Sequence, residues 1–144
     1  MADLSVTPAN VAPVTTQPNP SQYLQGVAGA TIAQGKTCYL DIDNLWKLAL
    51  NNGTATQSGS LDLGIALTSA ALNQPIIILT GGDINPGGTL VVGESYFVSS
   101  TAGGICPVAD IIATKLVSLL GVAISASVLR MLQAGPIVTG IAHA

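Results

Sequence analysis

Charged side chains are scarce in this chain of 144 residues, where they make up 8% of the sequence instead of the usual quarter. The four basic residues, Lys36, Lys47, Lys115 and Arg130, are scattered, and the net charge is −3. A nucleic-acid-binding surface needs clustered basic groups that neutralise phosphates, so we expect no direct binding of DNA or RNA. Because small polar and apolar residues must then form much of the surface, the composition predicts association with other proteins.

Groups suited to acid-base or nucleophilic catalysis are also few. The chain has seven carboxylates, one histidine at position 143 and no nucleophile elbow, and its paired glycines are not followed by the GK[ST] of a phosphate loop. Asp41 and Asp43 are the only close acidic pair. With Asn44 they could share a cation, but a hairpin turn whose Asx side chains bond backbone amides is the favoured interpretation. We predict no enzyme, no cofactor and no metal site.

Cysteine and long apolar runs are limited too. Cys38 and Cys106 stand 68 positions apart without a CxxC motif, so free thiols are expected, with a disulfide between the two halves as the alternative. Residues 116–129 form the most apolar stretch, but four of them are Ser or Gly, and a bilayer helix needs about 20 apolar residues. No basic cluster with a following apolar run marks a secretory signal, so we expect a protein made in the cytoplasm and used without such export.

What is present is a series of short β-branched runs separated by glycine and asparagine turns, which predicts an all-β fold, a small barrel or sandwich. Aromatic residues are only 3%, so Val, Ile, Leu and Ala must fill the core, and oligomer contacts would supplement it. The predicted strands are 25–32, 36–42, 46–50, 61–67, 75–79, 89–92, 95–99, 115–124 and 128–132. Residues 45–50 or 109–120 could instead form a short helix.

Two pairs of stretches match each other in the same order along the chain. They are residues 30–40 with 88–98, at an offset of 58, and residues 64–70 with 121–127, at an offset of 57. A single inserted residue explains the difference in offset. We therefore predict an internal two-fold repeat with units of about 24–81 and 82–144 inside one β domain, 23–144. Chance similarity among small residues is the alternative.

The first 22 residues carry Pro8, Pro13, Pro18 and Pro20 among Thr, Asn, Gln and Ser. Proline favours extended geometry over helix, so this segment is predicted to be an extended arm. It could be a disordered leader, or a strap that contacts another protein through the four prolines. If it is a strap, deleting residues 1–20 should leave the fold intact and weaken attachment.

Several motifs together resemble one protein family. They are Gly35-Lys36-Thr37-Cys38-Tyr39-Leu40-Asp41, Leu63-Gly64-Ile65-Ala66-Leu67, Gln74-Pro75-Ile76, Gly88-Thr89-Leu90-Val91-Val92-Gly93, Tyr96-Phe97-Val98-Ser99, Thr101-Ala102-Gly103-Gly104-Ile105 and Leu120-Gly121-Val122-Ala123. Across residues 26–132 this pattern is similar to the head decoration, or capsid cement, proteins of tailed bacteriophages. The long N-terminal arm departs from the shorter forms of that family.

The resemblance implies a β-rich virion protein, favoured as a homotrimer, that binds the exterior of an expanded capsid where major capsid proteins meet. Its partner would be the major capsid protein, and its location the outside of the virion. Another virion component, such as a head-fibre base or tail part, and a β-sandwich adhesion module remain alternatives. An adhesion module that binds sugars would normally expose several aromatic rings, and only Tyr23 and Trp46 are candidates.

Overall fold

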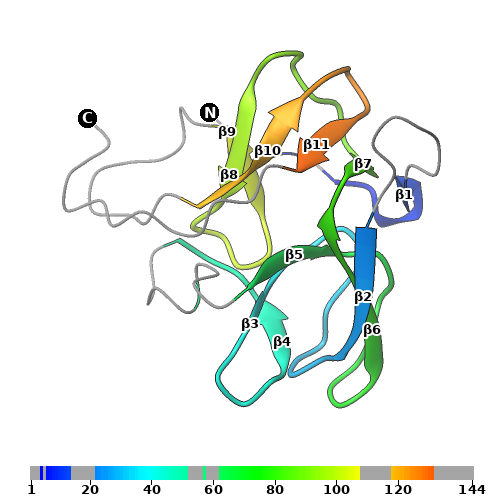
Figure 1. The fold of residues 1–144 in the computed structure, drawn as a ribbon, viewed down its shortest axis with the longest axis vertical. Helices are drawn as coiled ribbons and strands as arrows, with labels where there is room; N and C mark the ends of the chain where they lie inside the picture. The colour runs from blue at the N-terminus through cyan, green and yellow to red at the C-terminus, as the bar shows by residue number, and fades with distance from the viewer. Residues whose placement is uncertain are drawn as a thin grey trace.

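A computed structural model of the chain describes residues 4, 6–13, 22–51, 57, 62–107 and 118–131. These residues form two sheets whose neighbouring strands all run antiparallel, and a 3-10 turn, η1 (Pro8–Asn10), precedes the first strand. Figure 1 shows one sheet in the lower part of the molecule and the other in the upper part. The predicted all-β fold class is confirmed.

The first sheet occupies the lower part of Figure 1 and contains five strands in the order β2-β6-β5-β3-β4. These strands are β2 (Gln22–Val27), β3 (Thr37–Leu40), β4 (Trp46–Leu48), β5 (Leu63–Ala66) and β6 (Pro75–Gly81). An isolated parallel bridge between Ala28 and Trp46 connects the end of β2 with β4, the strand at the opposite edge of the sheet. The sheet is therefore rolled, because its two edges meet at this point.

The second sheet contains six strands in the order β1-β7-β11-β10-β8-β9. These strands are β1 (Val11–Pro13), β7 (Asp83–Pro86), β8 (Ser95–Val98), β9 (Ile105–Pro107), β10 (Leu119–Ala123) and β11 (Leu129–Met131). The chain passes from the first sheet to the second at Gly82, between β6 and β7. Gly82 has a φ of 78°, a backbone conformation that glycine adopts without steric cost.

Apart from β1, the two sheets have the same strand order, with β7 to β11 in the places of β2 to β6. Equivalent hydrogen bonds also recur at positions that the sequence alignment pairs. The Gly35 amide donates to the Ala66 carbonyl and the Gly93 amide to the Ala123 carbonyl, each at 2.8 Å. Both glycines have left-handed φ angles, 91° and 85°. This is the arrangement that an internal repeat predicts, and a common origin of the halves stays a prediction.

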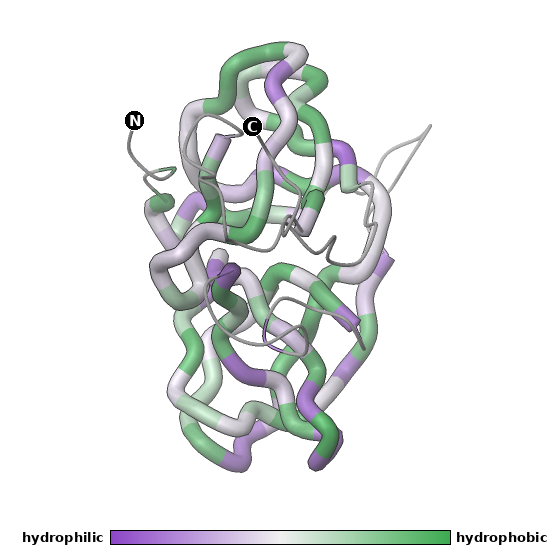
Figure 2. Tube along the Cα trace, turned by 90° about the vertical axis from the view of Figure 1, so that its left-hand side faces the viewer, coloured by the Kyte–Doolittle hydropathy of each residue, from purple (hydrophilic) through white to green (hydrophobic). Residues whose placement is uncertain are grey.

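The largest hydrophobic core draws side chains from both sheets, among them Ile65 of the first and Tyr96 and Val98 of the second. Strand alternation decides which residues enter it, because successive side chains point to opposite faces. Phe97, between Tyr96 and Val98, therefore lies on the other face with Cys106. Figure 2 shows apolar and polar stretches interspersed in both parts of the molecule.

Some predicted elements are wrong. Residues 89–92 lead into a turn and are not a strand, whereas residues 83–86, which no predicted strand covers, form β7. Turn-forming residues flank β7, but Ile84 is fully buried in the shared core, and this burial overrides the local turn propensity. The helix alternative at 45–50 is wrong because residues 46–48 form β4, and most of residues 109–120 lie outside the described residues.

The predicted arm is partly a component of the domain. Residues 11–13 form β1, which pairs with β7 at the edge of the second sheet, and β2 already begins at Gln22. Val11 is buried, and Leu4 and Val6 pack against the shared core. The expectation that residues 1–20 can be deleted without loss of stability is therefore corrected, since the deletion would remove a strand and core side chains.

Candidate interaction surfaces

The N-terminal segment, residues 4 and 6–13, runs along the second sheet and joins its two edges. The Leu4 amide donates to the Ile105 carbonyl in β9 at 2.7 Å, and the Thr7 amide donates to the Gly87 carbonyl at 2.9 Å. Pro8 begins η1 and Pro13 ends β1, and both are exposed. Pro18 and Pro20 lie outside the described residues. The two described prolines therefore lie on the surface of a segment that is bound to its own domain.

This segment also covers the turn around Gly35 in the first half. A Cβ atom at Gly35 would lie 2.8 Å from methyl groups of both Val6 and Val11. The Gln34 side-chain amide donates to the Val11 carbonyl at 3.0 Å, which fixes the segment to the turn. The alignment pairs this covered turn with the turn around Gly93 in the second half.

The turn around Gly93 has no such cover. A Cβ atom at Gly93 would meet no atom within 4 Å, and Val91 and Val92 are 62% and 64% exposed. The hydrogen bond from the Gly93 amide to Ala123 brings the turn beside the end of β10, where Ile124 is also exposed. Val91, Val92 and Ile124 are called the open turn below. The sequence alone did not predict that these residues are exposed, because exposure of short apolar side chains leaves no local signal.

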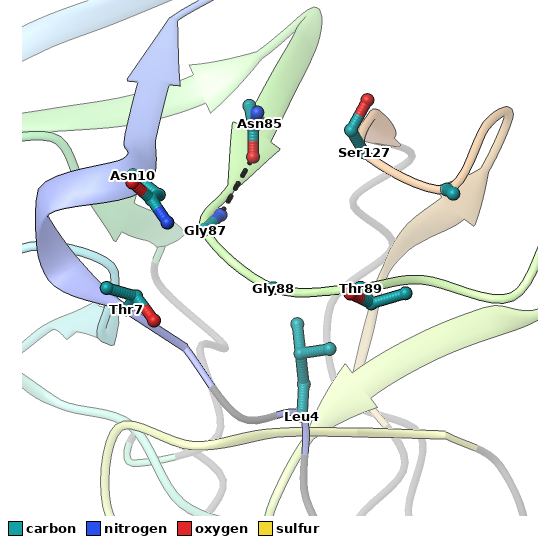
Figure 3. Close-up of a pocket in the computed structure, with 9 residues that line it drawn as sticks. Leu4, Thr7, Asn10, Asn85, Gly87, Gly88, Thr89 and Ser127 are labelled. Carbon is teal, nitrogen blue, oxygen red and sulfur yellow. Dashed lines mark hydrogen bonds between the residues drawn. The ribbon is translucent and has the colours of Figure 1, made fainter.

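A shallow pocket of about 750 Å³ lies between the N-terminal segment, the loop after β7 and the β10–β11 hairpin (Figure 3). The described residues of its lining carry amide and hydroxyl groups, from Asn10, Asn85, Thr89 and Ser127 among others, and none of these described residues is charged, a histidine or a cysteine. The Asn85 side-chain oxygen accepts a hydrogen bond from the Gly87 amide at 3.0 Å, which shapes the loop. These amide and hydroxyl groups can bind neutral polar ligands, and among the described lining residues no side chain is titratable.

Asp41 and Asp43 form a hairpin turn, as predicted, and Lys47 forms an ion pair with both of their carboxylates. The Lys47 ammonium lies 2.8 Å from Asp41 and 3.1 Å from Asp43. The other carboxylate oxygens accept the amides of Ile42 and Leu45. The hydrogen bond from Lys47, followed by that from the Ile42 amide, lowers the pKa of Asp41, and the same carboxylates raise the pKa of Lys47.

A second ion pair and the two cysteines lie within the sheets. Arg130 in β11 binds the nearly buried Asp83 in β7 through two hydrogen bonds of 2.9 and 3.1 Å, which raise the pKa of the guanidinium. Cys38 and Cys106 are buried thiols that form no disulfide, as the sequence analysis expected. Burial raises the pKa of Cys38 to about 12, and a protonated thiol is a poor nucleophile.

Within the described part of the chain, no three His, Cys, Asp or Glu side chains gather in a way that could hold a metal ion. In the same part of the chain, no helix is long and apolar enough to cross a bilayer. No family model and no curated protein matches the chain. The resemblance to decoration proteins therefore depends on the motifs in the sequence itself.

Proposed function

We propose that this protein is a decoration protein of a tailed bacteriophage, without enzymatic activity, which binds the outside of the head and stabilises the lattice of the major capsid protein. The open turn carries the proposal. It is an apolar surface on a rigid β scaffold, and its counterpart in the first half is covered by the N-terminal segment. A partner that covers the open turn would remove three exposed aliphatic side chains from water.

The chemistry of this surface favours a structural partner. Burying one valine or isoleucine side chain contributes roughly 1.5–3 kcal/mol, and this contribution depends little on salt. An attachment made by apolar contacts and neutral hydrogen bonds would hold at varied ionic strength, unlike one made by charges. The low charge of the chain fits this kind of attachment.

The mechanism would be stabilisation by selective binding. A decoration protein that binds the expanded lattice, and not its dissociated subunits, shifts the equilibrium toward the lattice as each site fills. Many copies on one shell sum their individual contributions. The capsid would then resist heat and internal pressure without any chemical step by the bound protein.

Cosedimentation with expanded shells of the major capsid protein of the same virus tests this function. We expect saturable binding that changes little with added salt, and a higher temperature of shell disruption in the bound state. Absence of the protein from the shell fraction at every concentration would overturn the proposal.

The substitution Val92→Lys tests the contribution of the open turn. It should weaken binding at least tenfold, because a charge would be desolvated against the shell. Ile42→Lys is the matched control, since Ile42 is 82% exposed in the turn between β3 and β4, away from the open turn. If both variants bind as the unchanged protein does, the open turn is not the contact, although decoration itself would stand.

One observation favours a second candidate, an adhesion module. The neutral pocket in Figure 3 presents amide and hydroxyl groups of the kind that bind sugar hydroxyls. It lacks an aromatic ring on which a sugar could stack, which makes this candidate weaker. Binding of the protein to a glycan array, abolished by Asn85→Ala, would favour adhesion over decoration.

A further inference from the structure

Strand β2 differs from the other strands that lie at sheet edges in having no protection against pairing. Edge strands usually avoid pairing with another chain by being short or by carrying proline or lysine. Of the three other edge strands, β1 ends in Pro13, β9 ends in Pro107, and β4 carries Lys47. Strand β2 has six residues, Gln22–Val27, with neither charge nor proline.

The side chains of β2 are accessible on both faces of the sheet. Tyr23 is 62%, Leu24 37% and Val27 40% exposed. Every residue of the strand is exposed except Gly26, which is half-buried. Figure 1 shows β2 at the margin of the lower sheet, paired with β6. Such an apolar edge is the type of surface to which another strand adds.

Hydrogen-bond alternation identifies which backbone groups of β2 face outward. Ala28 bonds toward the β6 side, because its amide donates to Gln74 and its carbonyl accepts from Asn73. Gly29, the next residue, donates to Trp46 on the opposite side. Since successive residues of a strand alternate, the amides and carbonyls of Tyr23 and Gln25 point away from β6. The approach of Trp46 limits the accessible part of this edge to the residues before Val27.

We propose that a second copy of this chain occupies the edge, with the two β2 strands pairing antiparallel about a two-fold axis at Leu24. In this register Tyr23 of each copy lies opposite Gln25 of the other, so the outward amides and carbonyls satisfy one another. Leu24 of one copy lies opposite Leu24 of the other, which brings two partly exposed apolar side chains together. No charge opposes its like, because β2 carries none.

This contact is independent of capsid binding. It joins two five-stranded sheets into one continuous sheet, and because it is isologous it closes after two copies. It also differs from the three-fold association that the resemblance implies. The mass of the full-length protein in solution therefore tests it separately from the proposed function.

Light scattering after size exclusion, over a wide range of concentration, is the experiment. We expect twice the mass of one chain. Gln25→Pro should halve that mass, because it removes an outward amide, and proline is tolerated at an edge position that faces solvent. Ile42→Lys, which replaces an apolar residue outside β2 that is more exposed than those of the strand, should leave the mass unchanged.

A charge exchange at Leu24 tests the register. Leu24→Lys and Leu24→Glu should each be monomeric, because like charges would lie directly opposite, and an equimolar mixture of the two variants should restore the dimer. Leu24 is not part of the described hydrophobic cores, so both variants should fold, as circular dichroism would verify. A monomer or trimer for the unchanged protein, or a dimer that survives Leu24→Lys, would overturn the proposal.

Discussion

At the scale of single residues, charged groups of the described chain pair with one another at a turn and between two strands. Lys47 joins two carboxylates at one hairpin, and Arg130 fixes Asp83 between two strands. The first group of ionic contacts lies at the β3–β4 turn, and the second lies between β7 and β11 of the other sheet. Asp41 and Lys47 consequently have shifted pKa values without lying in a catalytic cleft, as structural ion pairs can.

The Asp41 pair should make the β3–β4 hairpin sensitive to acid. The pKa of Asp41 is lowered from its ordinary 3.8 in the folded protein, chiefly by the Lys47 hydrogen bond. Its contribution to stability is therefore present above the unfolded-state pKa and is lost as the pH falls through the lower folded-state pKa. Carboxyl NMR titration should give an Asp41 midpoint below the ordinary value, and Lys47→Met should raise it. An unchanged midpoint in that variant would contradict the assignment.

The glycines at the two equivalent turns should respond differently to alanine. Both have left-handed φ angles, so each substitution costs roughly 1–2 kcal/mol of backbone strain. Gly35→Ala should cost about 1–3 kcal/mol more, because its methyl group would press on Val6 and Val11, whereas Gly93→Ala meets open space. Urea unfolding of both variants measures the difference. Equal losses would show that the N-terminal segment does not cover the first turn.

At the scale of elements, the N-terminal segment is a strand of the domain instead of a free strap. It adds β1 to β7, and Leu4 reaches β9 at the other edge of the same sheet. In the first sheet, a single bridge joins Ala28, just after β2, to Trp46 in β4 at the opposite edge, and leaves the earlier part of β2 unpaired on its outer side. The two halves therefore share a strand order but differ in how their edges are connected.

Neighbouring positions in β1 should show this integration. Val11 is buried in the shared core, and the adjacent Ala12 is exposed. Val11→Asp should destabilise the protein by about 3 kcal/mol or more, because it buries an unpaired charge. Ala12→Asp should change stability by less than about 0.5 kcal/mol, as surface substitutions usually do. Thermal unfolding compares the two, and similar melting temperatures would mean that β1 is dispensable.

At the scale of the whole molecule, one core makes the two halves interdependent. Ile65 from the first sheet and Val98 and Leu120 from the second are fully buried in the same cluster. Neither half can separate without exposing this cluster to water. We therefore expect the repeat units predicted from the sequence to unfold as one cooperative body.

Calorimetry should accordingly show one unfolding transition, with equal calorimetric and van't Hoff enthalpies. Ile65→Ala should lower stability by about 2–5 kcal/mol, as large-to-small core substitutions do, while keeping a single transition. Two separate transitions, with only one of them shifted by the substitution, would show that the halves unfold independently.

The sequence by itself determined the fold class, most strands, the Asp41–Asn44 turn and the two thiols without a disulfide, because these follow from local periodicity, turn chemistry and residue type. The internal repeat, which the matched stretches indicate, stays a prediction. Strand β7 and the burial of Val11 depended on the tertiary structure, since cross-strand pairing and a common core override local propensity. The open turn and the unprotected edge of β2 were likewise decided only in three dimensions, because exposure depends on which segments cover which surfaces, and no local pattern records that.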